Sequence, residues 1–175
     1  MQRFTPDIGE GLTSAQVNTR FSQFLFNDTN QKYSKSYASI FVGNLWQEIK
    51  AKRKIDKLSL LSAPTAKVIR DGAAVEIPAK DIVLDDVIVL SLGNQVPADC
   101  FLAEGFVEVN ESLLTGESVP VKKETGDILY AGSFISSGTC KVRADKVGKN
   151  TYLNTLSAKA KKYKKPNSEL MRSTK

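Results

Sequence analysis

The chain has 175 residues and a net charge of +6, with 41% hydrophobic and 25% charged residues. This length suits one domain with an appendage and is sufficient for a hydrophobic core. The sequence has no histidine, which excludes Ser-His-Asp and Cys-His catalysis, histidine metal sites and the usual proton shuttle near neutral pH. The basic excess leaves three partners open, because nucleic acid, an anionic membrane surface and phosphate chemistry would each attract it.

The first segment, residues 1–44, is expected to contain one helix over residues 11–27. Thr13 followed by Gln16 fits a capping box, in which each side chain satisfies a backbone donor at the start of the helix. Four apolar residues recur at helical spacing and would share one face. They are Val17, Phe21, Phe24 and Leu25.

A second helix is predicted over residues 45–64, where lysine and arginine crowd the sequence. One interpretation is the solvated face of an ordinary helix. The other is a stalk that leaves a membrane on its cytosolic side, where basic residues gather. No secretory signal begins the sequence and no apolar run reaches the roughly 18 residues that cross a bilayer, so the chain as given is expected to be soluble.

Residues 65–149 have the pattern of a β domain. Short runs of β-formers alternate with turn residues, and Asp71-Gly72 between two such runs is a strong hairpin signal. Strands this short predict a mainly β fold with flanking helices, an α+β arrangement whose core is a distorted jelly roll or small barrel. The last segment, residues 150–175, is expected to hold a helix that starts at Asn150 or Thr151, reaches about Tyr163 and continues into a linker.

The two cysteines, Cys100 and Cys140, lie far apart and match no zinc or redox spacing. Free cysteine is among the most buried residue types, so both are expected to be buried thiols in a reducing cytosol. Val96-Pro97-Ala98-Asp99 is expected to form a turn in which Asp99 accepts backbone hydrogen bonds and has no catalytic role.

The stretch "ESLLTGESVP" places Glu117 between a glycine and hydroxyl side chains. Four such residues alone are compatible with an ordinary tight turn. Their surroundings favour function, because three stretches occur in a fixed order and together resemble the actuator domain of cation-transporting P-type ATPases. These stretches are "DGAAVEIPAKDIVLDDVIVLSLGNQVPADCFL", "VNESLLTGESVPVKKETGDILYAGS" and "SSGTCKV…VGKNT".

The resemblance is close over residues 67–151 and looser in the flanks. It departs from the common family pattern at three places. Family members commonly have Gly-Asp at Asp85-Asp86, Asp-Glu-Ser at Asn110-Glu111-Ser112, and glycine at Cys100.

The resemblance implies a role for each residue of the Thr-Gly-Glu-Ser loop. In the family another domain carries an aspartate that takes phosphate from ATP. Glu117 would orient and activate the water that hydrolyses this aspartyl phosphate, because an ionised carboxylate can accept its proton. The backbone of Gly116 could approach the phosphoryl group closely. The hydroxyls of Thr115 and Ser118 would hold the loop or bind a phosphate oxygen.

The resemblance also implies cofactors and partners. A full-length pump would need ATP and Mg²⁺, whereas this segment would bind no cofactor or metal. Its partners would be the phosphorylation domain and the membrane helices of the same polypeptide, with no nucleic acid. The domain would lie on the cytoplasmic side of the cell membrane, and the segment alone would be monomeric.

The sequence has neither the Asp-Lys-Thr-Gly phosphorylation motif nor a Walker loop. The chain is therefore expected to be a fragment that does not hydrolyse ATP alone. Residues 39–48 stand where the family has a hairpin of two membrane helices, which suggests that the hairpin was removed and its flanks joined. An uninterrupted full-length coding sequence across these residues would contradict that hypothesis.

Two other functions are compatible with parts of the pattern. A basic β domain could bind nucleic acid or an anionic membrane surface, although it has few aromatics spaced for base stacking. A free-standing acid–base enzyme would pair Glu117 with Glu111 or Glu124, but lacks a complementary partner. The transported ion cannot be identified, because ion sites would lie in membrane helices.

Overall fold

The computed structural model describes residues 3–28 and 64–163. The helix predicted over residues 45–64, the proposed hairpin join at residues 39–48 and the linker beyond residue 163 lie outside these ranges. Within the described part, no helix is both long and apolar enough to cross a bilayer.

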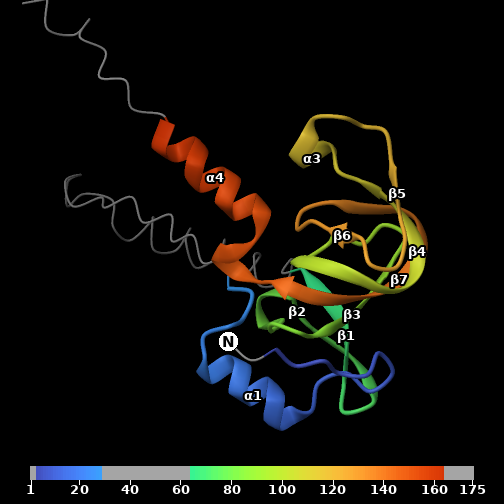
Figure 1. Cartoon of the computed structure of the whole chain (residues 1–175), viewed down its shortest axis with the longest axis vertical. Helices are drawn as coiled ribbons and strands as arrows, with labels where there is room; N and C mark the ends of the chain where they lie inside the picture. The colour runs from blue at the N-terminus through green and yellow to red at the C-terminus, as the bar shows by residue number, and fades with distance from the viewer. Residues whose placement is uncertain (1–2, 29–63, 164–175) are drawn as a thin grey trace, which may run out of the picture.

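One antiparallel sheet of seven strands forms the body of the described domain, in the order β2-β1-β3-β7-β4-β5, with β6 paired to β4 (Figure 1). The mainly β, α+β prediction is confirmed. The described strands leave the sheet open, however, so the barrel-like closure was wrong. The strands are β1 (Thr65–Arg70), β2 (Ala73–Pro78), β3 (Val87–Ser91), β4 (Asp99–Asn110), β5 (Val121–Lys123), β6 (Ile128–Leu129) and β7 (Phe134–Lys146).

The sheet curves where its two long strands, β4 and β7, pair. Gly105 has φ 95° and Gly138 has φ 87°, in the left-handed region that favours glycine. A Cβ on Gly105 would lie 2.6 Å from the carbonyl oxygen of Thr139, and one on Gly138 would lie 2.5 Å from that of Phe106. The two strands can therefore approach this closely only because both positions are glycine.

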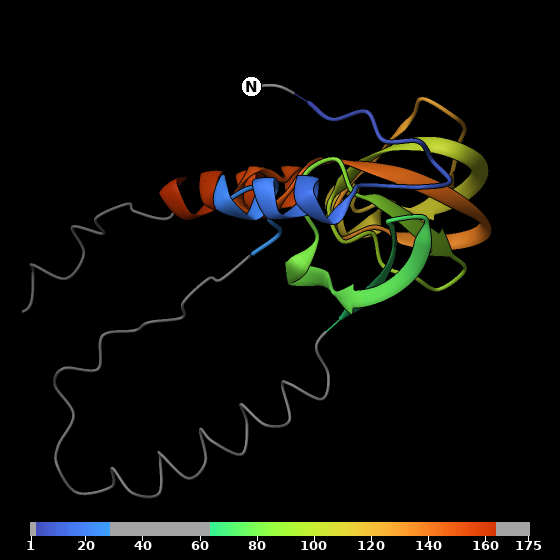
Figure 2. The same cartoon turned by 90° about the horizontal axis from the view of Figure 1, so that it is seen from below.

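The main hydrophobic core lies against the sheet and includes Val68, Ile88, Leu102 and Val142, all nearly or fully buried. The described ranges also hold three α-helices and two 3₁₀ helices. Helices α1 and α4 lie on the same side of the sheet, whereas α3 lies at the end opposite α1 (Figures 1 and 2). The helices are α1 (Ser14–Ser22), η1 (Ala79–Asp81), α3 (Ser112–Thr115), η2 (Gly148–Asn150) and α4 (Tyr152–Tyr163).

Helix α1 begins as predicted and ends earlier than predicted. Thr13 and Gln16 form the capping box. The helix stops at Ser22, and Phe24 adopts φ 58° and is 83% exposed. The chain turns there so that Leu25 packs against the main core and Phe26 pairs with Val83. Placing Phe24 on a buried helical face was therefore wrong.

The N-terminal segment is tied to the sheet by a buried ion pair. Arg20 is 1% exposed and its guanidinium contacts the carboxylate of Asp85, which is fully buried. Asp85 also accepts from the backbone N–H of Phe4 (3.0 Å) and pairs with Arg3 Nε (3.0 Å). Asp85 has φ 72°, a conformation that costs an ordinary residue about 1–2 kcal/mol. Residues 3–28 thus belong to the folded domain.

The β1–β2 turn holds the start of α1. The carboxylate of Asp71 accepts from the hydroxyl and from the backbone N–H of Ser14 (3.0 Å for the latter). The hydroxyl bond, followed by the backbone bond, lowers the pKa of Asp71 below its usual value. A carboxyl whose pKa is lower in the folded state stabilises the fold above its unfolded pKa. That contribution is lost as the pH falls through the folded value.

We expect Ser14→Ala to raise the pKa of Asp71 towards its ordinary value, because the largest cause of the shift is removed. The variant should consequently lose less stability than the parent chain between neutral and strongly acidic pH. NMR titration of the Asp71 carboxyl measures the pKa directly. An unchanged pKa in the variant would contradict this prediction.

Both cysteines are buried, as predicted. Burial raises the pKa of the Cys140 thiol to about 11 and raises that of Cys100 well above its usual value. Since thiolates are the reactive form, both thiols are inert at neutral pH.

Candidate functional site

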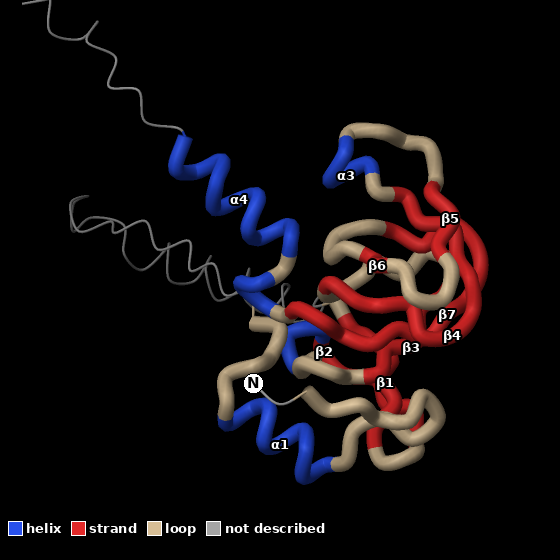
Figure 3. The backbone as a smooth tube through the Cα atoms, viewed as in Figure 1, coloured by secondary structure: helices blue, strands red, loops and turns tan. Residues whose placement is uncertain are grey.

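The Thr-Gly-Glu-Ser loop projects from the end of the sheet, between β4 and β5, as Figure 3 shows. The short helix α3 leads into it. The backbone N–H of Ser112 donates to Asn110 Oδ1 (2.9 Å) at the end of β4. The carbonyl oxygen of Glu111 then accepts from the N–H groups of Leu114 (2.8 Å) and Thr115 (3.0 Å). The loop therefore starts from a hydrogen-bonded turn at the end of β4, the strand that pairs with β7 along its length.

Thr115 and Gly116 set the path of the loop. The Thr115 hydroxyl donates to the carbonyl oxygen of Glu111 (3.2 Å) and accepts from the backbone N–H of Glu117 (3.2 Å). Gly116 ends α3 with φ 80°, and a Cβ there would have no neighbour within 4 Å. Gly116 is thus required locally by the backbone conformation, and the space beside it is open.

Glu117 and Ser118 are exposed at the loop. In residues 3–28 and 64–163, no group donates a hydrogen bond to the Glu117 carboxylate or forms an ion pair with it. Leu113 and Val119, which flank the motif, are 65% and 75% exposed. The domain therefore presents an uncommitted carboxylate among exposed apolar side chains.

A buried ion pair supports the base of the loop. Lys123 Nζ on β5 lies 3.0 Å from Glu111 Oε1, and both side chains are largely buried. Lys123 also lies 6.0 Å from the centroid of the Tyr130 ring. Sequence reasoning missed Lys123 because nothing local marks it: β5 pairs with β4 so that Lys123 lies opposite Val107, and its side chain reaches Glu111 beyond the paired residues.

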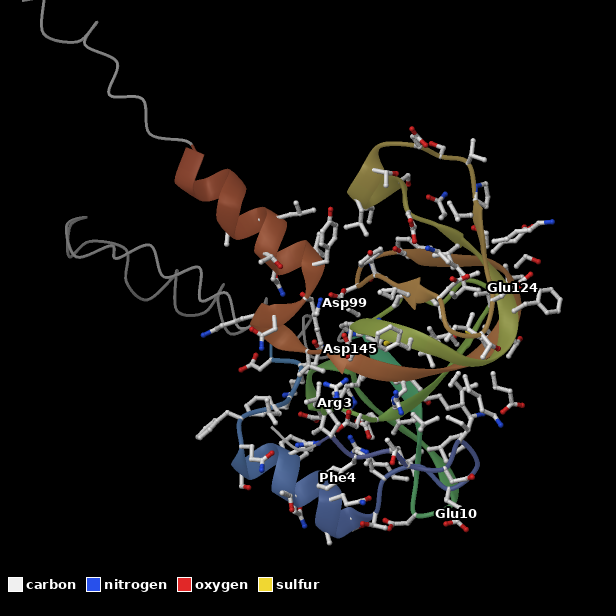
Figure 4. The ribbon with its side chains drawn as sticks, viewed as in Figure 1. Arg3, Phe4, Glu10, Asp99, Glu124 and Asp145 are labelled. Carbon is white, nitrogen blue, oxygen red and sulfur yellow. The ribbon has the colours of Figure 1, made fainter. Side chains whose placement is uncertain are left out.

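The carboxylates that a free-standing acid–base enzyme would need are not brought together. Glu111 is committed to Lys123, and the backbone N–H of Glu124 donates to Asp127 in a separate turn. Figure 4 places Glu124 on the far side of the sheet from the base of α4, away from the α3 end. The part of the chain that is described holds no group of three His, Cys, Asp or Glu residues that could bind a metal.

Replacing Thr115 by valine should loosen the loop without unfolding the domain, because it removes the hydroxyl that bridges Glu111 and Glu117. The free energy of unfolding should change by no more than about 1 kcal/mol. Amide hydrogen exchange at Glu117 should become faster, and Thr115→Ser, which keeps the hydroxyl, is the matched control. Equal exchange rates in the serine and valine variants would show that the bridge does not order the loop.

Asp99 lies far from the loop, at the start of β4. Its carboxylate accepts from the backbone N–H groups of Ala131 (3.0 Å) and Tyr152 (2.7 Å). The side chain is 2% exposed. Asp99 therefore accepts backbone hydrogen bonds, but the prediction that they come from its own turn was wrong, because the donors lie 32 and 53 residues further along the chain.

Comparison with known proteins identifies the family of this domain. The family model of the P-type ATPase actuator domain matches residues 60–161, and the chain therefore belongs to that family. Among similar curated proteins is the probable cation-transporting ATPase exp7 of Streptococcus pneumoniae, 44% identical over 72% of this chain and 16% of its own. Another is the calcium-transporting ATPase CtpE of Mycobacterium tuberculosis, 41% identical over 97% of this chain and 22% of its own. A third is a copper-exporting P-type ATPase of Bacillus subtilis, 39% identical over 67% and 15%.

Solved structures give the same result. A zinc-transporting PIB-type ATPase in its E2.Pi state matches with a TM-score of 0.53 and 29% identity, over 62% of this chain and 19% of that one. A second structure of a zinc-transporting PIB-type ATPase, in a different state, matches with a TM-score of 0.53 and 28% identity, over 69% and 20%. The chain thus spans about a fifth or less of the length of these proteins.

Proposed function

We propose that this domain works within a cation-transporting P-type ATPase and presents Glu117 to an aspartyl phosphate carried by another domain of the same polypeptide. One observation carries the proposal. Glu117 is exposed on a loop whose base is fixed by the Thr115 hydroxyl and by Gly116, and its carboxylate has no partner among the described residues. A carboxylate kept available in this way can meet a water molecule and a neighbouring domain.

The proposed step is the hydrolysis of an acyl phosphate. The Glu117 carboxylate accepts a proton from water as the water oxygen forms a bond to phosphorus. The bond between phosphorus and the aspartate oxygen breaks in line, releasing inorganic phosphate and a free aspartate carboxylate. Thr115 and Gly116 hold the loop, and Ser118 offers a hydroxyl beside the reacting group.

ATP and Mg²⁺ belong, in this proposal, to other parts of the full-length protein. ATP would supply the phosphoryl group and Mg²⁺ would neutralise charge on it. The described residues have no cluster suited to binding the metal, since they contain no group of three metal-ligating side chains. The contribution of this chain is the carboxylate and its loop.

We also propose that the domain lies on the cytoplasmic side of the membrane, joined to membrane helices of the same polypeptide. The coverage of the three curated relatives named above supports a place in a longer polypeptide, because the chain matches only 15–22% of their lengths. The removal of a membrane hairpin at residues 39–48 stays a prediction, tested by the full-length coding sequence. Relatives named for calcium and for copper both carry a similar domain.

The test is the decay of the phosphorylated intermediate in a full-length ATPase that carries Glu117→Gln. The variant should form the phosphoenzyme and release phosphate more slowly than the parent. Decay at the parental rate would reject the role of Glu117.

A further inference from the structure

The Val-Pro-Ala-Asp turn before β4 lies where two chain segments leave the described core. Residues 3–28 end beside this turn, and α4 begins beside it (Figure 1). Two buried polar side chains lie in this region, Asn27 and Asp99, which are 5% and 2% exposed. Figure 4 shows Asp99 directly below the base of α4. Buried polar groups at such a place need partners, and both side chains have them.

Asn27 uses both ends of its side-chain amide. Its Nδ2 donates to the carbonyl oxygens of Ala79 (3.1 Å) and Pro97 (2.9 Å), and its Oδ1 accepts from the backbone N–H of Gly148 (2.8 Å). Gly148 begins the 3₁₀ helix that leads into α4. One amide therefore joins the end of the N-terminal segment to the turn before β4 and to the residues that precede α4.

Asp99 holds the first turn of α4 directly. The first helical hydrogen bond runs from the N–H of Thr155 to the carbonyl oxygen of Thr151, so Thr151 is the N-cap. The Thr151 hydroxyl donates to the carbonyl oxygen of Gly148 (3.0 Å), whereas the N–H of Tyr152 donates to Asp99 Oδ2 (2.7 Å). A carboxylate from a distant strand thus caps the helix and complements its dipole.

We propose that Asn27 and Asp99 form a polar junction that fixes the directions in which the N-terminal segment and α4 leave the sheet. Neither segment can swing away without leaving buried donors or acceptors unpaired, and such unpaired groups are strongly disfavoured. The core and α4 therefore move as one body. The junction does not depend on the proposed function. Its consequence is that displacing α4 displaces the Glu117 loop, and the importance of that displacement for catalysis rests on the proposed function.

Tyr152 offers a sharp test, because proline is tolerated at the first helical position. Thr151 has φ −64° and ψ 151°, the extended conformation that proline requires of the preceding residue. Tyr152→Pro removes the backbone N–H that donates a hydrogen bond to Asp99, and Tyr152→Ala keeps it. Both variants lose the ring that packs against Tyr130 at 4.9 Å between centroids, so the pair isolates the hydrogen bond.

The experiment uses the 175-residue chain and measures both the direction and the protection of α4. Spin labels on cysteines replacing Ala158 and Lys122, both exposed, report distances by double electron–electron resonance. Tyr152→Ala should retain the distance distribution of the parent, and Tyr152→Pro should broaden it. The Thr155 amide should exchange about tenfold faster in the proline variant, as expected for losing a hydrogen bond to a charged group, while the Val142 amide keeps its protection.

Asp99→Asn is the second variant. Its amide has one oxygen acceptor, so it keeps only one of the two hydrogen bonds, and its NH₂ group faces the backbone N–H of either Ala131 or Tyr152. Loosening of α4 is expected for the orientation that turns the NH₂ group towards Tyr152. Distance distributions and Thr155 exchange equal to those of Tyr152→Ala in both variants would overturn the proposal. Unfolding of both variants, with Tyr152→Ala folded, would also overturn it, because the bond would then maintain the fold rather than direct a helix. Neither readout depends on Glu117, so a failed junction is distinguishable from a failed catalytic role.

Discussion

Glu117→Gln in a full-length ATPase carrying this domain is expected to leave phosphoenzyme formation intact and to slow phosphoenzyme decay by about 10²-fold or more, the range for losing a positioned base. Glutamine keeps the length and shape of the side chain but accepts no proton. Because Glu117 is exposed and its side chain has no partner in the described part of the domain, the substitution should not affect folding. The decay of phosphate-labelled enzyme after a chase with unlabelled ATP measures the effect.

Two variants give this experiment its specificity. Glu124→Gln removes another exposed carboxylate of the same sheet, in a turn apart from the loop, and should decay at the parental rate. Glu117→Asp keeps the charge but falls about one methylene short, so it should also slow decay. Equal slowing by Glu124→Gln would indicate a general charge effect and would remove the special role of Glu117.

Asp85→Ala is expected to destabilise the domain by about 3–5 kcal/mol, because it removes the buried carboxylate that pairs with the guanidinium of Arg20. Alanine also inherits the φ of 72°. Asp85→Gly should cost about 1 kcal/mol less, since glycine adopts that φ without strain. Chemical denaturation of the 175-residue chain measures the free energy of unfolding for each variant.

The double variant Arg20→Leu with Asp85→Gly should recover much of the lost stability. Replacing a whole buried ion pair by apolar groups is often neutral, whereas removing one partner is not. Arg3, whose side chain is 37% exposed, can regain water in that variant. The loss in the free energy of unfolding should be smaller in the double variant than the losses of Arg20→Leu and Asp85→Gly added together. If it equals that sum, Arg20 and Asp85 are not coupled and the network does not hold the N-terminal segment.

What could be predicted from the sequence was local. The Asp71-Gly72 hairpin and the Thr13–Gln16 capping box depend on residues within a few positions of one another. The Thr-Gly-Glu-Ser loop was found by its motif. The end of α1 was missed, because Phe24 leaves the helix to let Leu25 reach a core made by distant strands.

Partners far apart in the sequence were also missed. Asp85 stood out as a departure from the family pattern, but no local signal connects it to Arg20, 65 residues away. Lys123 and Asn27 are ordinary residues until strand pairing and the turn before β4 place them beside Glu111 and Pro97. Asp99 was assigned to a turn, and its bond to the N–H of Tyr152 follows only from the folded chain.

Strand β4 has a mechanical consequence, since it begins at Asp99 and ends at Asn110. Its first residue, Asp99, accepts a hydrogen bond from the N–H of Tyr152 at the start of α4. Its last residue, Asn110, accepts one from the N–H of Ser112, in the turn that leads to Glu117. Twelve residues of strand span at most about 40 Å, so β4 connects the start of α4 to the start of the loop over much of the length of the sheet. A rotation of β4 about its Asp99 end would therefore move the loop that carries Glu117 farther than it moves the start of α4.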